Sequence, residues 1–274
     1  MWDDPRVTGL LRLMQAALRP PPGAGRIALA LTLGLSTHLV FALAVLAMML
    51  AMFFGLSESF GQVAQPYAWV ANIALIVQFP LAHSLFLTAR GNLLLTRLVP
   101  GPYGATLATT TYALIASAQL LALFTLWTPS GIVWWRAEGL AFGLICMAYG
   151  ASWLILLKAS FDAGAEVQSG ALGWMSLLGR IAPRFPDMPT RGLFRIIRQP
   201  IYVAFALTLW TVPVWTPDQL LLAVSYTTYC LLAPRLKERR FAARYGDRFT
   251  DYRARTPYAL PRISRNDPQR PDNL

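Results

Sequence analysis

The sequence predicts an all-α, polytopic membrane protein, a helical bundle with about six transmembrane spans. Three observations predict this class. Of the 274 residues, 55% are hydrophobic and only 14% are charged, whereas about a quarter of the residues of a soluble domain are charged. Apolar runs long enough to cross a bilayer recur along the chain, and lysines and arginines concentrate in alternate connecting segments.

Residues 1–26 are predicted to form an amphipathic cytoplasmic segment. Its apolar residues fall on one broad face of a helix: Val7, Leu10, Leu11, Leu13, Met14 and Leu18. Such a helix is expected to lie on the membrane surface, and the sequence RPPPGAG at 19–25 is expected to end it. The start of the chain is acidic and the first apolar run is too long for a signal sequence, so no cleavable signal is expected.

Residues 27–157 are predicted to be a four-span membrane body. A span needs about 20 apolar residues, and the runs that meet this need are 27–54, 69–87, 105–126 and 140–157. Residues 158–274 are predicted to contain a cytoplasmic loop, a helical hairpin and a C-terminal segment. The hairpin comprises runs 201–215 and 219–236, of which the first is short, about 22 Å long as a helix.

The positive charges predict the orientation. All of the 24 lysines and arginines except Arg136 lie before the first predicted span, in every second loop, or from the end of the last span onward. Cation-rich segments stay in the cytoplasm, so both termini are expected there, with the protein in the bacterial inner membrane. The positive charges that give the net charge of +11 are then expected to bind anionic membrane lipids. No nucleic acid partner is expected.

A polar helix is predicted over residues 237–255, after the last span. Four aromatic side chains lie along one of its faces: Phe241, Tyr245, Phe249 and Tyr252. Such a helix can fold back as a lid over the base of the hairpin. The two histidines and two cysteines of the chain provide no cluster with metal-ligand spacing, so no metal is expected.

Arg198, Gln199 and Pro200 mark the entry to the fifth predicted span, and Glu238 follows the sixth. A hairpin brings these two points together. A carboxylate, an arginine and aromatic rings in a partly dry cleft suit a zwitterionic ligand that carries a ring and a positive centre. The same residues could equally anchor the helix ends at the membrane interface, and the residue pattern leaves both interpretations open.

The last third of the chain resembles the integral membrane methyltransferase superfamily of isoprenylcysteine carboxyl and phospholipid methyltransferases. The matching residues are Arg198-Gln199-Pro200-Ile201-Tyr202, Lys237-Glu238, Tyr245-Gly246, Phe249, Tyr252, Thr256-Pro257 and Leu260-Pro261. A closer resemblance, to the methanethiol S-methyltransferase family, extends upstream. It rests on Asn72, Gln78-Phe79, His83-Ser84, Pro100, Trp127-Thr128-Pro129, Val133-Trp134, Trp210-Thr211-Val212-Pro213 and Thr216.

The resemblance implies an S-adenosylmethionine-dependent methyltransferase (EC 2.1.1 class) that methylates a small thiol by in-line transfer, with the C-terminal segment holding the cofactor. The implied cofactor-binding residues are Arg198, Gln199, Pro200, Tyr202, Glu238 and Tyr252. Glu238 would hold the ribose or the amino end of the methionine portion. Arg239, implied as a catalytic residue together with His83, would hold its carboxylate. His83, an ionisable residue in a span, would be the catalytic base for the thiol, although a histidine hydrogen-bonded for packing is an alternative.

The chain departs from the superfamily pattern at three positions. Gln199 replaces a histidine, Lys237 replaces the first acid of a pair, and Ala204 replaces a glycine. Because of these changes, the residues do not identify the methyl acceptor. A lipid or prenylcysteine carboxylate is an alternative methyl acceptor, and a non-enzymatic membrane protein built on the same fold is a further alternative.

Overall fold

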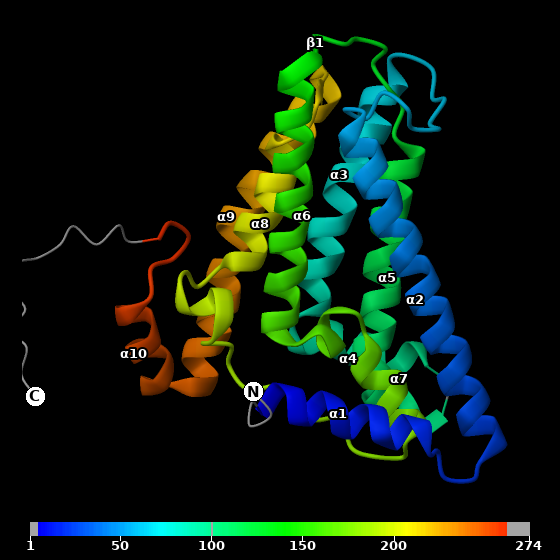
Figure 1. Ribbon diagram of the computed structural model, residues 1–274. Helices are drawn as coiled ribbons and strands as arrows, with labels where there is room; N and C mark the ends of the chain where they lie inside the picture. The colour runs from blue at the N-terminus through cyan, green and yellow to red at the C-terminus, as the bar shows by residue number, and fades with distance from the viewer. Residues whose placement is uncertain (1–4, 100, 262–274) are drawn as a thin grey trace, which may run out of the picture.

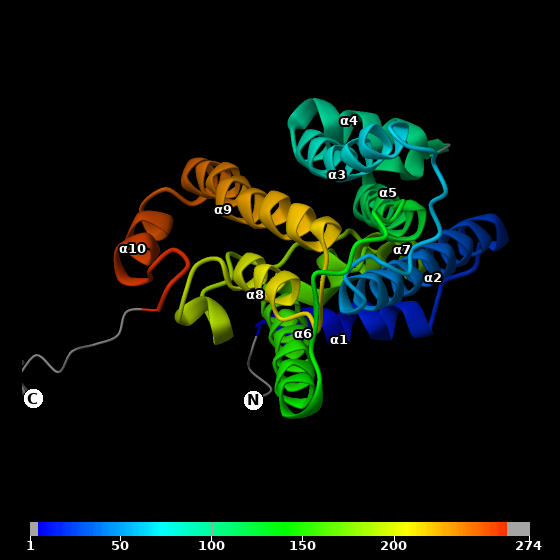
Figure 2. The same ribbon diagram turned by 90° about the horizontal axis from the view of Figure 1, so that it is seen from above.

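The computed structural model describes residues 5–99 and 101–261, with side chains from Thr8 onward. Pro100, which contributes to the resemblance, and the acidic start of the chain up to Asp4 lie outside the described residues. The described chain is almost entirely helical and forms an elongated bundle with short extra elements at both ends (Figure 1). Figure 2 shows α8, α9 and α10 on one side of this bundle and α2 on the other.

Four helices within the described residues are long and apolar enough to cross a membrane. They are α2 (Ala24–Phe53), α3 (Tyr67–Phe86), α5 (Gly104–Leu126) and α6 (Gly139–Gln168). They match the first four predicted spans, except that α6 continues 11 residues beyond the predicted end at 157, with a kink at Gly164 (φ 101°, ψ 89°) inside this extension. Many large apolar side chains on them face outward, such as Leu35 and Leu140 at 71% and 80% exposure, as expected of helices that face lipid. The protein is therefore an integral membrane protein.

The helical hairpin consists of α8 (Pro200–Trp210), β2 (Val214–Trp215) and α9 (Pro217–Tyr245). The prediction that the fifth run continues to residue 215 is wrong, because Val214–Trp215 pairs antiparallel with β1 (Trp135–Arg136) instead. With 11 residues, α8 is about 16 Å long, much shorter than the roughly 30 Å hydrocarbon core. Six crossings require α8 and α9 to pass through the membrane together as a hairpin, and this topology stays a prediction.

The remaining helices and turns gather mainly at the end of the bundle opposite β1 (Figure 1). They are α1 (Pro5–Leu18), α4 (Ala89–Leu98), η1 (Gly101–Tyr103), α7 (Ala171–Leu178), η2 (Gly192–Arg195) and α10 (Asp247–Arg255). The amphipathic α1 packs against α7 and buries Leu13, so part of its apolar face is covered by protein. The predicted end of this helix at RPPPGAG is confirmed.

The polar helix predicted over 237–255 is wrong as a single element. Its first half continues α9 to Tyr245, and its second half is the separate α10. Between them, Gly246 adopts φ 51° and ψ −124°, a conformation that side chains with a Cβ atom rarely adopt. The glycine turns the chain so that α10 folds back beside the end of α9.

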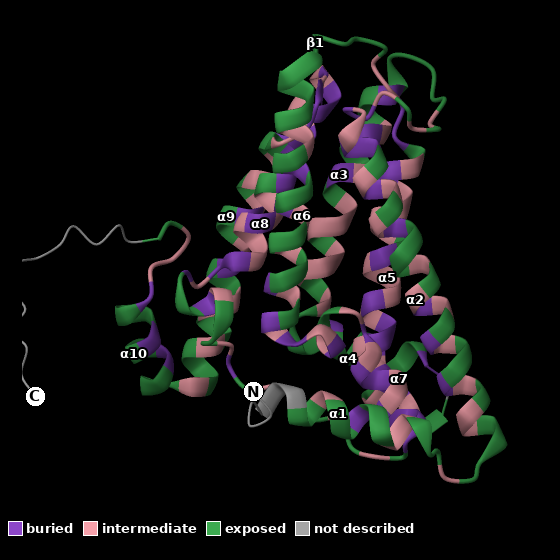
Figure 3. Ribbon diagram, in the orientation of Figure 1, coloured by how far each residue is buried: buried purple, intermediate pink, exposed green. Residues whose placement is uncertain are grey.

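The main hydrophobic core lies between the bundle helices towards the β1–β2 end (Figure 3). Its fully buried large side chains come from four helices and from the segments that follow α2, α5 and α8, and include Met52, Leu123, Trp127, Leu209 and Leu222. This core packs the hairpin against α2, α3, α5 and α6. The opposite end of the hairpin carries the polar residues of the candidate site.

A buried carboxylate fixes the start of α9. Asp218, in its first turn and 2% exposed, accepts hydrogen bonds from Trp127 Nε1 at 3.1 Å, from the Ser130 backbone N–H at 2.9 Å and from Ser130 Oγ at 2.5 Å. The negative charge also suits the positive end of the helix dipole. These contacts join the hairpin to the segment that follows α5.

Replacing Asp218 by Ala is expected to destabilise the protein by roughly 3 kcal/mol, since it leaves several buried donors without a charged acceptor. The check is the melting temperature of the detergent-purified protein. Glu58→Gln is the matched control, because Glu58 is exposed in the loop after α2, whose Gly55 carbonyl accepts a hydrogen bond from Thr216 at the start of α9, and its substitution should leave the melting temperature unchanged. Equal melting temperatures for the two variants would contradict the structural role of Asp218.

Candidate active site

The hairpin brings together two points of the chain that lie 40 residues apart. Arg198 Nε donates a hydrogen bond to Glu238 Oε1 at 2.8 Å, and Gln199 Nε2 donates to the same oxygen at 2.7 Å. The Arg198 and Glu238 side chains are only 10% and 15% exposed. Pro200 occupies the first turn of α8, where its missing N–H costs nothing. The three side chains therefore form one partly buried polar cluster at the base of the hairpin.

The segment after α10 closes over this cluster. The backbone N–H groups of Arg198 and Gln199 donate to the carbonyls of Pro257 at 2.9 Å and Tyr258 at 3.1 Å. The guanidinium of Arg198 also donates to the Arg253 and Thr256 carbonyls and lies 5.5 Å from the centroid of the Tyr258 ring. The segment that covers the hairpin base is therefore mainly 256–258, just after the helix that was predicted as a lid, and its contacts are chiefly through the backbone.

Tyr252 and Tyr202 each contact a residue next to the cluster. Tyr252, in α10, donates from its hydroxyl to the Phe194 carbonyl at 2.6 Å. Tyr202, one turn into α8, has its ring 5.4 Å from Lys237 Nζ. The structure thereby brings together all six residues implied as cofactor-binding. Arg239, in contrast, is exposed and makes no hydrogen bond or ion pair within the described chain.

One polar atom in this cluster has no partner. Gln199 is 2% exposed, and its Oε1 atom is buried without a hydrogen bond to any described residue. A buried acceptor without a partner costs free energy. It can be satisfied by a ligand that donates an N–H or O–H group.

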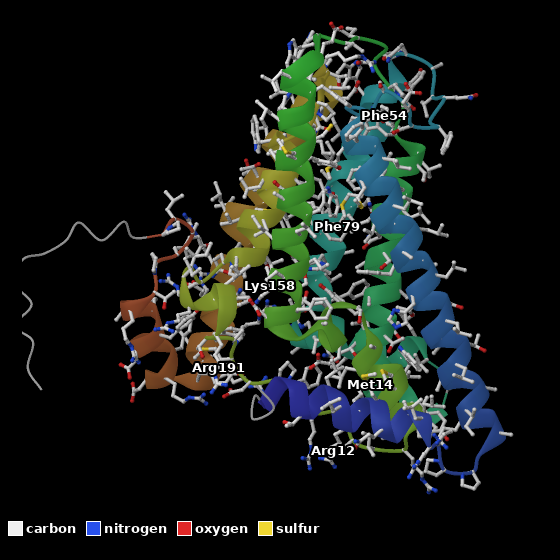
Figure 4. The ribbon with its side chains drawn as sticks, viewed as in Figure 1. Arg12, Met14, Phe54, Phe79, Lys158 and Arg191 are labelled. Atoms are coloured by element: carbon white, nitrogen blue, oxygen red, sulfur yellow. The ribbon has the colours of Figure 1, made fainter. Side chains whose placement is uncertain are left out.

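Two cavities adjoin each other, and one of them reaches the segment that closes over the cluster. One, of about 610 Å³, is lined by Tyr252, Thr256, Asp251 and Arg195 among others. The other, of about 570 Å³, lies among α1, α7 and the segment before η2, and both are bordered by Met188, Thr190 and Arg248. Their volumes are in the range of about 300–1,000 Å³ typical of ligand sites. Figure 4 labels Arg12 and Arg191, which border the second cavity from α1 and from the segment before η2.

His83 lies in α3, on the side that faces α9. Its Nδ1 atom is 2.7 Å from the Tyr112 hydroxyl of α5, and its ring is 5.0 Å from that of Phe79, which Figure 4 places between the bundle helices. The ring of Tyr229, in α9, is 6.5 Å away, and Tyr229 lies near the Ser84 side chain. His83 therefore belongs to a polar and aromatic cluster shared by three helices.

Arg240 lies between this cluster and the hairpin base. The Arg240 guanidinium donates to the Leu87 carbonyl at 3.0 Å and lies close enough to interact electrostatically with His83 and Tyr202. Tyr202 also interacts electrostatically with Tyr229. The side of the hairpin that carries the predicted donor residues therefore faces the side of α3 that carries His83.

Sequence reasoning missed Tyr112, Tyr229, Arg240 and Phe194. For the pair on α9 a signal was available, because Tyr229 and Arg240 are 11 residues apart, which is close to three helical turns and puts them on one face. Tyr112 and Phe194 gave no such signal, since their positions depend on how α5 and η2 pack against other elements.

Two acidic residues near the end of α6 have separate surroundings. Asp162 pairs with Lys158 and accepts a hydrogen bond from the Leu193 N–H at 2.8 Å, so it holds η2 against α6. Glu166, 8% exposed, lines the cavity of about 570 Å³. Neither residue belongs to the hairpin-base cluster or to the His83 cluster.

Comparison with known proteins decides the family. The chain is 31% identical over 199 residues to methanethiol S-methyltransferase 1 of Bradyrhizobium diazoefficiens, a match that covers 71% of this chain and 67% of the relative. The chain belongs to the methanethiol S-methyltransferase family. Methanethiol S-methyltransferase of Pseudomonas deceptionensis is 26% identical over 202 residues, which cover 73% of this chain and 76% of that protein.

The family lies within the integral membrane methyltransferase superfamily, so the protein is a membrane methyltransferase. Nurim of Xenopus laevis is a more distant relative, 28% identical over 187 residues, 62% of this chain and 61% of that protein. No family model matches the chain, and no solved structure matches it.

Proposed function

We propose that this methanethiol S-methyltransferase family member transfers a methyl group from S-adenosylmethionine to a small thiol at the inner face of the cell membrane. The observation that carries the proposal is the hairpin-base cluster, in which Glu238 accepts hydrogen bonds from Arg198 and Gln199 beneath the segment that follows α10. This cluster joins residues that the family resemblance assigns to the donor. Cation-rich segments at the same end of the bundle support a cytoplasmic position for it.

The residues present fit the methyl donor. Bound S-adenosylmethionine supplies a methyl group already activated by a sulfonium centre. The unpartnered Gln199 Oε1 offers an acceptor for one of the donor's N–H or O–H groups. Glu238 offers a carboxylate for its ribose or amino end, and Tyr252 lines the adjoining cavity of about 610 Å³.

His83 is assigned to the acceptor. A thiol reacts as its thiolate, so the residue beside it must take up the proton. When His83 Nδ1–H donates to the Tyr112 hydroxyl oxygen, Nε2 is unprotonated and can accept the thiol proton. The rings of Phe79, Tyr112 and Tyr229 surround His83 and favour an acceptor without a large polar group.

The decisive test is calorimetric binding of S-adenosylmethionine to the full-length protein in detergent. The wild type is expected to bind with a roughly micromolar Kd, and Glu238→Gln to weaken binding about 100-fold, because an amide replaces a carboxylate that holds charged and polar groups. Glu58→Gln, at the other end of the molecule, is the matched control and should bind as the wild type does. Failure of the well-folded wild type to bind would reject the donor assignment.

The acceptor is then tested with a labelled methyl group. Small alkyl thiols are expected to become labelled when the wild type, the donor and the thiol are mixed. Phospholipid vesicles and a prenylcysteine are offered in parallel. Labelling of either of these in preference to the thiols would replace the proposed acceptor while leaving the donor assignment intact.

A further inference from the structure

Lys237 lies in a cage of three aromatic rings. Its Nζ atom is 5.7 Å from the ring centroid of Phe194 in η2, 5.4 Å from that of Tyr202 in α8 and 5.8 Å from that of Phe241 in α9. The faces of aromatic rings attract cations, and cages of this kind bind ammonium-like groups. The three rings come from three separate elements, so the cage exists only in the folded protein.

Among the residues that the structure describes, none forms an ion pair with the lysine in this cage. The neighbouring carboxylate, Glu238, is engaged by Arg198 and Gln199, and within the described chain no carboxylate forms an ion pair with Lys237. Burial lowers the pKa of the Lys237 amine from its usual 10.5 to about 8, with the positive charges of Arg240 and Arg198 acting in the same direction and Glu238 opposing them. The three rings attract the ammonium group, but its burial and the two guanidinium groups disfavour its charge, so loss of the proton or movement out of the cage is not opposed by an ion pair.

The cage adjoins the residues that border the cavity of about 610 Å³. Phe241 packs against the cluster of Met188, Phe249 and Tyr252, and both Met188 and Tyr252 line that cavity. Tyr252 also donates its hydrogen bond to the Phe194 carbonyl. A ligand seated between this cavity and Glu238 would thus have a cation-binding cage beside it.

We propose that the Phe194–Tyr202–Phe241 cage is the subsite for the sulfonium group of the methyl donor, and that the Lys237 ammonium competes for it. This inference rests on the proposed function. Two positive charges repel each other in so small and partly dry a space, so Lys237 must swing out or lose its proton when the donor binds. Its flexible four-carbon stem permits the movement. Lys237 therefore determines how well the site distinguishes a charged sulfonium from a neutral thioether.

The test compares two ligands that differ in that charge. S-adenosylmethionine carries the sulfonium, whereas S-adenosylhomocysteine carries a neutral sulfur and has the same adenosine, amino and carboxyl groups. Calorimetry is done at pH 7 on the full-length protein in detergent, for the wild type, Lys237→Ala and Lys237→Gln. Lys237→Gln retains most of the stem without the charge and guards against a packing defect in Lys237→Ala, and thermal melting verifies that each variant is folded.

Loss of the Lys237 charge is expected to tighten binding of S-adenosylmethionine about tenfold and to change binding of S-adenosylhomocysteine much less. Phe241→Leu, introduced into Lys237→Ala, is expected to reverse most of the gain for the charged ligand alone. Equal weakening of both ligands would overturn the proposal, because it would mean that Lys237 holds a group common to both. Absence of binding of either ligand to every folded variant would reject the donor assignment itself.

Discussion

Replacing Arg198 by Met is expected to abolish donor binding and to destabilise the protein by roughly 3 kcal/mol, the order of magnitude for removing one partner of a largely buried ion pair. The guanidinium pairs with Glu238 and also donates to the carbonyls of Arg253 and Thr256. Its loss leaves the Glu238 carboxylate with Gln199 alone and releases the segment after α10. Calorimetry with S-adenosylmethionine and thermal melting in detergent measure the two effects.

Arg248→Met is the matched control for stability. Arg248 also forms an ion pair, with Asp187 at 2.6 Å, but the two side chains are 64% and 60% exposed, and exposed pairs contribute little. Its melting temperature should equal that of the wild type. If Arg198→Met melts as the control does, Arg198 does not hold the hairpin base together.

Replacing His83 by Ala is expected to lower the rate of thiol methylation at neutral pH by about 10²–10⁴-fold, the usual contribution of a positioned base. Affinity for S-adenosylmethionine should not change, because His83 lies in the cluster shared by α3, α5 and α9 rather than at the hairpin base. Initial rates at saturating donor, measured beside calorimetric donor binding, separate these two effects.

The pH profile distinguishes a base from a packing residue. A thiol that loses its proton to bulk water needs no base, so the rate of His83→Ala should rise towards that of the wild type as pH approaches the pKa of the acceptor thiol. Tyr112→Phe, which removes only the hydroxyl beside Nδ1, should cause a smaller loss of about tenfold. A constant ratio between the rates of His83→Ala and wild type at every pH would assign His83 to packing.

Much of the fold follows from local sequence properties. The length and apolarity of the runs predict both ends of α2, α3 and α5 to within three residues. This works because a helix must contain a minimum number of apolar residues to cross the bilayer, and that number can be counted in the sequence. The break at RPPPGAG is likewise local, since a run of prolines cannot continue a helix. The extension of α6 to Gln168 is not local. Its charged last turns are held by contacts such as that of Asp162 with the Leu193 N–H.

Some features of the candidate site likewise follow from the sequence, and others follow only from the packing. Order and spacing along the chain identify Arg198, Gln199, Tyr202 and Glu238, because family motifs are properties of the sequence. Their mutual geometry follows from the hairpin, which any chain with two adjacent helices of this kind would form. The assignment of Arg239 to the same group illustrates the limit, since successive helix residues point about 100° apart and Arg239 faces outward.

The sequence by itself determined the membrane class, the first four spans, the family and the residues at the base of the hairpin. Only the tertiary structure decided that Tyr112 contacts His83, that Gln199 keeps an unpartnered oxygen, and that Lys237 is enclosed by three rings from η2, α8 and α9. The physical reason is the separation along the chain over which each interaction acts. Hydropathy, helix breaking and motif spacing act between neighbours in the chain, whereas a cage or a hydrogen bond between helices depends on how distant segments pack.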